Sequence, residues 1–186
     1  MHTDDDGSER WIEAGLAELA EGGIDRVRVE VVAGRLGVTK GGFYRRFKDR
    51  AALLNAMLDS WSRGRIAVVH QQTALAGLPP RERLKAIVKL YSERVNAQGM
   101  AVELAIRQWA RSDKLAAASV AQVDAARLKN VAQLYRKLGF TDAAAQERAI
   151  LFYSFIFGQS LLFLEQAPRK PTSLLAACAE ILIETG

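Results

Sequence analysis

The sequence contains few of the residues that build disulfides, metal sites or catalytic histidine pairs. Its 186 residues include one cysteine, Cys178, and two histidines, His2 and His70. A single cysteine cannot form an internal disulfide, and two histidines supply little for a metal site. We therefore expect a protein of the reducing cytoplasm that needs no metal and no other cofactor.

Signals for catalysis and for membrane insertion are also scarce. The chain lacks a glycine-rich phosphate loop, a metal-ligand cluster and a histidine-based triad, so we expect no enzyme and no catalytic residue. The apolar stretch 150–164 is interrupted by serine, glycine and glutamine, and it is shorter than the roughly 20 residues that span a bilayer. The acidic first residues lack the basic and apolar segments of a secretory leader. We expect a buried helix and no membrane partner.

Proline and glycine are sparse, with 4 and 14 residues, and this leaves long segments of helical periodicity. The pattern predicts an all-α fold of about nine helices, with caps at Ser8, Ser112 and Thr141. Gly139 is expected to stop the helix that precedes Thr141. The expected helices cover residues 8–22, 29–36, 39–47, 50–75, 80–99, 100–111, 112–138, 141–166 and 172–184.

The segment 29–46 has the spacing of a helix-turn-helix. Its second helix must cross the first closely, which requires a small residue at the crossing and a turn residue that tolerates positive φ. Ala33 is the small residue, and Gly37, four positions later, is the turn glycine. Phe43 and Phe47 are expected in the core. The apolar anchors around the turn are Val32, Leu36, Val38 and Phe43.

Positive charge gathers around the second helix of this motif. The net charge of +5 and the pI near 9.6 favour a polyanionic partner only weakly, so the position of the charges matters more. Thr39 stands where it can cap that helix, whose free N–H groups would then face a phosphate or a base edge. A solvated basic face and a buried Tyr44 are the alternatives. The basic cluster consists of Arg35, Lys40, Arg45, Arg46, Lys48 and Arg50, opposed locally only by Asp49.

The run Gly37-Val38-Thr39-Lys40-Gly41-Gly42-Phe43-Tyr44-Arg45-Arg46-Phe47, with residues 48–54 after it, resembles the signature of the TetR family of transcriptional regulators. The similarity covers residues 8–58. It implies a homodimer, usually a repressor that a ligand releases. It also implies that Thr39 and Tyr44 contact phosphates, that Lys40, Gly41 and Gly42 face the major groove, and that Arg50 contacts the DNA backbone.

The chain departs from the family pattern at three positions. Arg28 stands where serine or threonine commonly caps the first helix of the motif, Gly42 stands where a side chain is more common, and Arg50 replaces the usual lysine. Both arginines can still bind phosphate. The expected DNA-binding residues are Arg28, Thr39, Lys40, Gly41, Gly42, Tyr44, Arg45, Arg46 and Arg50.

Residues 1–50 are thus predicted to form a tail and a DNA-binding domain, and residues 51–186 a helical domain for effector binding and dimerisation. In the larger domain, aromatic and polar residues are mixed on segments that are otherwise apolar, as in a ligand pocket between helices. Core packing and surface ion pairs, such as Glu103 with Arg107, are the alternative. The candidate ligand-binding residues are Trp61, Tyr91, Arg94, Arg107, Trp109, Phe152 and Phe155.

The expected helix 141–166 is apolar on more than one face. One face suffices for an intrachain core, so a second face predicts a four-helix dimer interface shared with the last helix. A larger intrachain core is the alternative. The candidate interface residues are Tyr153, Phe157, Ser160, Leu161, Leu164, Leu175 and Leu182.

These patterns predict a ligand-responsive transcriptional regulator, most often a repressor in such a family. A homodimer would present two recognition helices, at residues 39–46, to a near-palindromic operator with half-sites about 34 to 36 Å apart. A small-molecule effector would shift the fourth helix and change that spacing. A helical module that uses the motif for protein contacts is the competing hypothesis, and it would show little salt dependence with duplex DNA.

Overall fold

The computed structural model describes residues 3–74, 77–92, 97–162 and 171–184, and the prediction of an all-α fold is confirmed. In these ranges every regular element is helical, and none is long and apolar enough to cross a membrane. The elements are α1 (Thr3–Gly22), η1 (Ile24–Arg26), α2 (Val29–Leu36), α3 (Lys40–Tyr44), α4 (Arg50–Ala74), α5 (Pro80–Ser92), α6 (Ala97–Trp109), α7 (Lys114–Lys137), α8 (Asp142–Gly158), η3 (Gln159–Leu161) and α9 (Pro171–Ile183).

The helices form two compact units, and each is described separately below. The first unit comprises residues 1–65 and 97–123, and the second comprises residues 66–96 and 124–186. The helices α4 and α7 contribute to both units. This division follows intrachain packing, so the predicted functional boundary at residue 50 stays a proposal.

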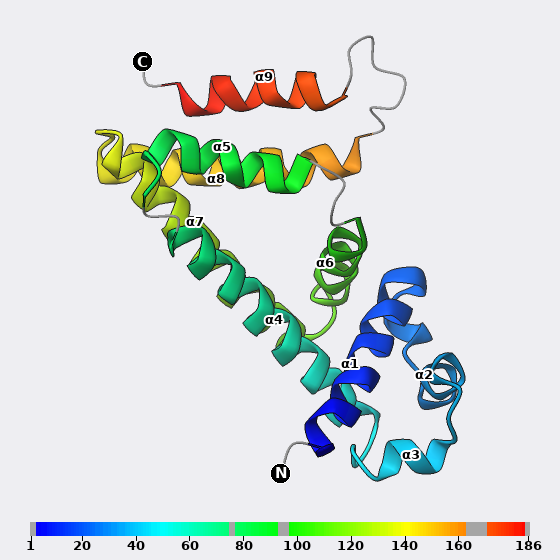
Figure 1. Cartoon of the computed structure of the whole chain (residues 1–186). Coiled ribbons are helices and arrows are strands. Elements are labelled where there is room, and N and C mark those ends of the chain that lie inside the picture. The colour runs from blue at the N-terminus through cyan, green and yellow to red at the C-terminus, as the bar shows by residue number, and fades with distance from the viewer. Residues whose placement is uncertain (1–2, 75–76, 93–96, 163–170, 185–186) are drawn as a thin grey trace. The chain divides into compact units, whose positions relative to one another are not determined.

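In the first unit, α1 packs against both α2 and α6, and α3 follows α2 closely (Figure 1). Aromatic rings fill the space beneath α3. Phe43 is fully buried, with Trp11 edge-on at 5.4 Å and Phe47 stacked at 5.5 Å between ring centroids. The prediction that Phe43 and Phe47 belong to the core is confirmed.

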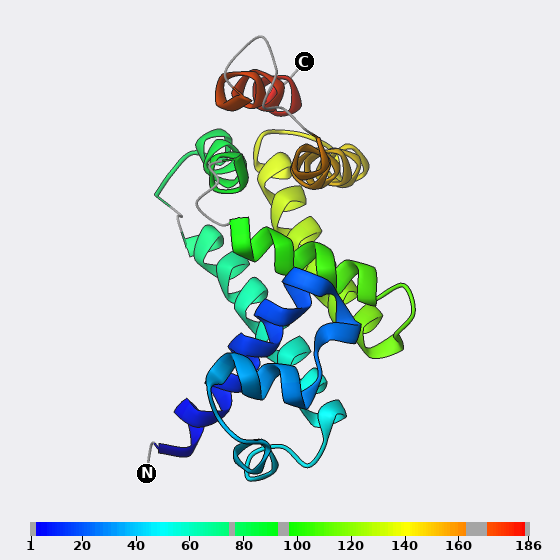
Figure 2. The ribbon, with the colours of Figure 1, turned by 90° about the vertical axis from the view of Figure 1, so that its right-hand side faces the viewer.

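In the second unit, α5, α8 and α9 run side by side, and Figure 2 shows them end-on. The Tyr135 hydroxyl donates a hydrogen bond of 2.9 Å to the Leu182 carbonyl near the end of α9. The Arg148 guanidinium lies 4.1 Å from the centre of the Phe140 ring and donates to the same carbonyl at 3.3 Å. These contacts connect α7, α8 and α9 around one apolar core.

Several helix ends differ from the sequence expectation. Helix α1 begins at Thr3 rather than at Ser8, and α6 begins at Ala97, so it runs through Gly99. Asp113 rather than Ser112 caps α7, because its carboxylate accepts a hydrogen bond of 2.9 Å from the Ala116 N–H. The Ser112 hydroxyl donates instead to the Trp109 carbonyl at 3.3 Å.

The predicted cap at Thr141 is confirmed, since its hydroxyl accepts from the Ala144 N–H at 3.3 Å. The helix that it begins is shorter than predicted. Helix α8 ends at Gly158, and the chain continues through η3 to Leu162, which is extended. Glycine and serine are weaker helix formers than the aliphatic residues around them, which explains the early end. The predicted end at Gln166 lies outside the described residues.

Candidate nucleic-acid interface

The turn between α2 and α3 is built on one glycine. Gly37 adopts φ 66° and ψ 29°, the left-handed region that glycine enters without steric cost. The Gly37 N–H donates to the Gly34 carbonyl at 3.1 Å, and the Val38 N–H donates to the Ala33 carbonyl at 3.0 Å. This pair of hydrogen bonds is a Schellman motif, which ends α2 and sets the direction in which the chain leaves it. The predicted turn glycine is confirmed.

Helix α3 has five residues, and its apolar side rests on α1. A Cβ built at Gly42 would lie 3.8 Å from the Trp11 ring, so this position faces α1 at least in part. Val38 is 43% exposed and does not anchor the turn as predicted. Ala33 and Val32, by contrast, are buried as expected.

The recognition segment, defined here as residues 39–46, is presented to solvent. Tyr44 is 61% exposed, which removes the alternative that it is a core aromatic. Thr39 occupies the cap position before α3, but its hydroxyl makes no capping hydrogen bond. Gly42 and Arg50 are partly buried. The other predicted DNA-binding residues are exposed, namely Arg28, Thr39, Lys40, Gly41, Tyr44, Arg45 and Arg46.

Lys40 and Arg50, both predicted DNA-binding cations, already have close partners within the chain. The Lys40 ammonium lies 2.5 Å from the Glu30 carboxylate, and the hydrogen bond from Lys40 lowers the pKa of Glu30. Arg50 donates to the carbonyls of Val27 at 2.5 Å and of Ile24 at 2.7 Å. Arg50 therefore secures the chain between α1 and α2, and it reaches DNA only if it leaves these carbonyls.

Asp49 is not the only acidic residue near the basic cluster, and that part of the expectation is wrong. Its carboxylate instead accepts a hydrogen bond of 2.8 Å from the Ala52 N–H at the start of α4. The carboxylates that oppose the cations come from α1 and α2, because the fold brings these helices against η1 and α3. Within the part of the chain that the structure describes, Arg45 and Lys48 have no ion pair. Arg46 lies against Gly7 of α1 and approaches the Gly42 carbonyl at 3.4 Å.

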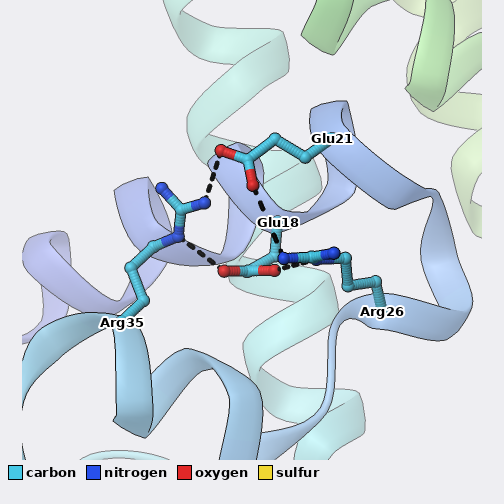
Figure 3. A network of polar contacts seen from close by, with 4 residues as sticks. All are labelled: Glu18, Glu21, Arg26 and Arg35. Atoms are coloured by element: carbon cyan, nitrogen blue, oxygen red, sulfur yellow. Dashed lines mark hydrogen bonds and ion pairs between the residues drawn. The ribbon is translucent and has the colours of Figure 1, made fainter.

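Figure 3 shows an ion-pair network, defined here as Glu18, Glu21, Arg26 and Arg35. One oxygen of Glu18 accepts from Nε of Arg26 at 2.5 Å, and the other accepts from Nε of Arg35 at 2.6 Å. Glu21 accepts from a terminal nitrogen of Arg35 and lies 3.7 Å from Arg26. The network thus connects α1, η1 and α2. Sequence reasoning missed it, since its partners are far apart along the chain.

The electrostatics of Glu18 follow from this network. Burial of its carboxyl would raise the pKa, but the hydrogen bonds from Arg35 and Arg26 outweigh that effect and hold the pKa below its usual value. A carboxylate of lowered pKa stabilises the folded state above its unfolded pKa, and this contribution is lost as the pH falls through the lowered value. The network is therefore intact at neutral pH.

The predicted ligand-binding residues fall into both units. Trp61, Arg107 and Trp109 belong to the first unit, whereas Tyr91, Phe152 and Phe155 belong to the core cluster of the second unit or pack against it. Arg94 lies outside the described residues.

Glu103, expected in a surface ion pair with Arg107, is instead 2% exposed. It accepts from Arg107 at 3.0 Å and lies 3.5 Å from Arg65, so the fold places this ion pair between α4 and α6. Trp109 also lines a groove of about 610 Å³ between the end of α1 and α6.

The predicted interface residues divide into buried and exposed groups. Tyr153 is 5% exposed and Leu175 is 9% exposed, so both belong to the second unit's own core rather than to its surface. Phe157 and Leu182 are partly buried, and Leu161 is 64% exposed. Leu164 and the side chain of Ser160 lie outside the described residues. The exposed aliphatic side chains that sequence reasoning missed are Ile150, Leu151 and Leu162, whereas Ile181, expected at the interface, is 70% exposed.

A short helix held across its neighbour by a glycine turn, with an exposed basic surface, defines the helix-turn-helix class of DNA-binding proteins. Residues 12–57 match the family model described as bacterial regulatory proteins of the tetR family. The chain is 29% identical over 116 residues to the HTH-type transcriptional repressor KstR of Mycobacterium tuberculosis. That match covers 62% of this chain and 52% of the repressor, which is about half of its length.

Solved structures share the fold over nearly the whole chain. A candidate transcriptional regulator from Saccharomonospora viridis, solved in complex with choline, has a TM-score of 0.78 at 18% identity, covering 98% of this chain and 97% of that one. A transcriptional regulator from Rhodococcus sp. Rha1 has a TM-score of 0.76 at 20% identity, covering 95% and 93%. Residues 12–57 are thus similar to the TetR family of transcriptional regulators, and the chain has the fold of these solved regulators.

Proposed function

We propose that this regulator is a cytoplasmic, ligand-responsive repressor that binds a near-palindromic operator as a homodimer through the recognition segment 39–46. The observation that carries the proposal is that most residues of this segment are exposed, while its Phe43 is fully buried and holds it on the core of the first unit. Arg45, Arg46 and Lys48 extend the cationic surface without any ion pair to a described carboxylate. Cations of this kind bind phosphates and position the protein, whereas contacts with base edges specify the sequence.

Selection of bound duplexes from a random DNA pool tests the proposed operator binding. The selected sequences should contain two inverted half-sites whose centres are about one helical turn, or a related spacing, apart. Affinity should also fall steeply with salt, because each phosphate contact contributes about 0.9 to the slope of log K against log salt concentration. A flat salt response and no enriched sequence would favour the rival hypothesis of a protein-interaction module.

The proposed homodimer is supported by exposed apolar residues on α8 and α9. Leu151 on α8 is 59% exposed and Ile181 on α9 is 70% exposed, and apolar side chains of this size on the surface favour burial against a partner. Leu151→Glu should raise the dissociation constant of the dimer by about tenfold or more, because two-fold symmetry would bury the new charge in both copies.

The matched control is Leu115→Glu on α7. Leu115 is 61% exposed and belongs to the first unit, so the same chemical change falls on neither α8 nor α9. Analytical ultracentrifugation should detect a weaker dimer only for Leu151→Glu. Equal behaviour of the two variants, or a wild-type monomer at every concentration, would exclude this interface.

A small-molecule effector is supported by the structural neighbour that was solved in complex with choline. The effector would act only through a difference in its affinity for the two conformations of the protein. A thermal-shift screen finds ligands that prefer the folded state, since such ligands raise its melting temperature. A saturating hit that leaves operator affinity unchanged would disprove the proposed coupling.

A further inference from the structure

The two carboxylates of the ion-pair network hold two arginines that would otherwise add to the cationic surface of the helix-turn-helix. The side chains of Arg35 and Arg26 are 33% and 49% exposed, so both guanidinium groups lie at the surface of the first unit. The Glu18 side chain between them is only 4% exposed. Its two oxygens contact different arginines (Figure 3), and a charge-assisted hydrogen bond of this kind is directional as well as strong.

The network also determines where α2 ends. Arg35 is the penultimate residue of α2, directly before Leu36 and the Gly37 turn that directs α3. Glu18 and Glu21 hold this arginine from α1, so two ion pairs connect the last turn of α2 to α1. A change at Glu18 would therefore alter the position of the recognition segment without altering any residue of that segment.

Positioning and charge have different consequences for DNA binding. Nonspecific binding depends on the number of cations that reach phosphates and tolerates an imprecise orientation of α3. Operator binding also requires base-edge contacts, and these depend on the position and orientation of the recognition helix. Suppose that one residue controls both the number of available cations and the orientation of α3. Its replacement would then change nonspecific affinity and operator affinity in opposite directions.

We propose that Glu18 determines DNA specificity in this regulator, because its buried carboxylate, supported by Glu21, neutralises Arg26 and Arg35 and at the same time positions α2 and α3 for operator contacts. Glu18 itself contacts no DNA in this account and acts as a positioning residue. The inference rests on the proposed operator binding. It adds that specificity depends on a buried carboxylate of α1, outside the recognition segment.

The test compares full-length Glu18→Gln with Glu13→Gln. Glu13 is exposed on the same helix, and within the described structure it has no ion pair, so both variants change the net charge equally. The probes are the duplex selected from the random pool and a scrambled duplex of the same length. Fluorescence anisotropy over a range of salt concentrations gives both affinities and both salt slopes, and circular dichroism verifies that each variant is folded.

For Glu18→Gln, affinity for the scrambled duplex should rise about fivefold at low salt, and the slope should steepen by about 0.9 for each freed arginine that reaches a phosphate. Affinity for the selected duplex should fall about tenfold. Glu13→Gln should change both affinities slightly and in the same direction. Unfolding would lower both affinities together, so opposite changes identify a role beyond stability.

Further variants separate the two effects of Glu18. In Glu18→Gln combined with Arg26→Gln and Arg35→Gln, the scrambled-duplex affinity should return to the wild-type value while operator affinity stays low. Should Glu18→Gln not fold, Arg35→Gln alone should lower operator affinity without raising scrambled-duplex affinity. Equal responses of Glu18→Gln and Glu13→Gln, or no loss with Arg35→Gln, would overturn the inference. A wild-type protein that selects no duplex would instead refute the proposed function.

Discussion

The same short sequence pattern begins both α3 and α8, and the two helices differ greatly. Leu36-Gly37-Val38-Thr39 precedes α3, and Leu138-Gly139-Phe140-Thr141 precedes α8. Both glycines have positive φ, 66° and 96°, and both threonines are extended at the cap position. Helix α3 nevertheless has five residues, whereas α8 has 17.

The residues after the turn explain this difference. Thr141 caps α8 with its hydroxyl, Asp142 places a negative charge in the first turn, and three alanines follow, all of which favour a helix. After Thr39, Lys40 places a positive charge in the first turn of α3, and Gly41 and Gly42 weaken the helix. The first turn of α3 thus combines low intrinsic helix stability with an exposed cation, which suits an anionic partner. The first turn of α8, by contrast, is stabilised by its own capping residue and acidic side chain.

The largest expected effect concerns the support beneath α3. Phe43→Ala should lower the free energy of unfolding by about 3 to 5 kcal/mol, because it removes a fully buried ring that contacts Trp11 and Phe47. Urea denaturation measures this loss. Tyr44→Ala, at the exposed neighbouring position, should cost much less stability. Similar losses for the two variants would mean that α3 does not depend on its buried side.

The next effect concerns DNA affinity. Arg46→Ala should weaken binding to every duplex by about tenfold and make the salt slope shallower by about 0.9, as expected for the loss of one phosphate contact. Lys40→Ala should weaken operator binding more than binding to a scrambled duplex, if Lys40 leaves Glu30 for a base edge. Anisotropy titrations distinguish the two outcomes, with thermal melts to verify folding. Unchanged operator binding in both variants would reject these roles.

A smaller effect compares the two threonines directly. Thr141→Ala should lower the free energy of unfolding by about 1 kcal/mol, because it removes the capping hydrogen bond to Ala144. Thr39→Ala removes no such bond, so its effect on stability should stay within about 0.5 kcal/mol. It should lower operator affinity instead. Chemical denaturation of the pair measures the contrast, and equal losses would show that Thr39 also acts as a cap.

The smallest effect is a gain in stability. Gly42→Ala should stabilise the protein by up to about 1 kcal/mol, since alanine is the better helix former and the new methyl group would lie at van der Waals distance from Trp11. Gly37→Ala should instead destabilise it, because alanine is strained at positive φ. Thermal denaturation gives the sign of each change. A destabilising Gly42→Ala would mean that the α1 surface does not accommodate a side chain there.

Local signals made the helix-turn-helix predictable from the sequence. The positive φ of Gly37, the small Ala33 and the buried Phe43 follow from steric rules that involve near neighbours in the chain. The partners of the cations do not follow from such rules. Arg35 reaches Glu18, which is 17 positions away, and the same charge pattern is compatible with a freely solvated arginine.

The second unit shows the same limit for apolar residues. Helical periodicity identified more than one apolar face on α8 but not which of them the chain itself covers. The fold buries Tyr153 in the core that it shares with residues of α5, α7 and α9, and it leaves Leu151 exposed. Residues with similar hydrophobicity are interchangeable in a sequence pattern, and only the packing of neighbouring helices distinguishes them.

The sequence alone determined the all-helical class, the position of the recognition segment and the surplus of positive charge around it. These features depend on backbone preferences and on spacings of a few residues. The tertiary structure decided which of those charges remain available and which apolar side chains face solvent. Both outcomes depend on contacts between distant segments, and the free energy of such contacts is defined only after the helices have packed.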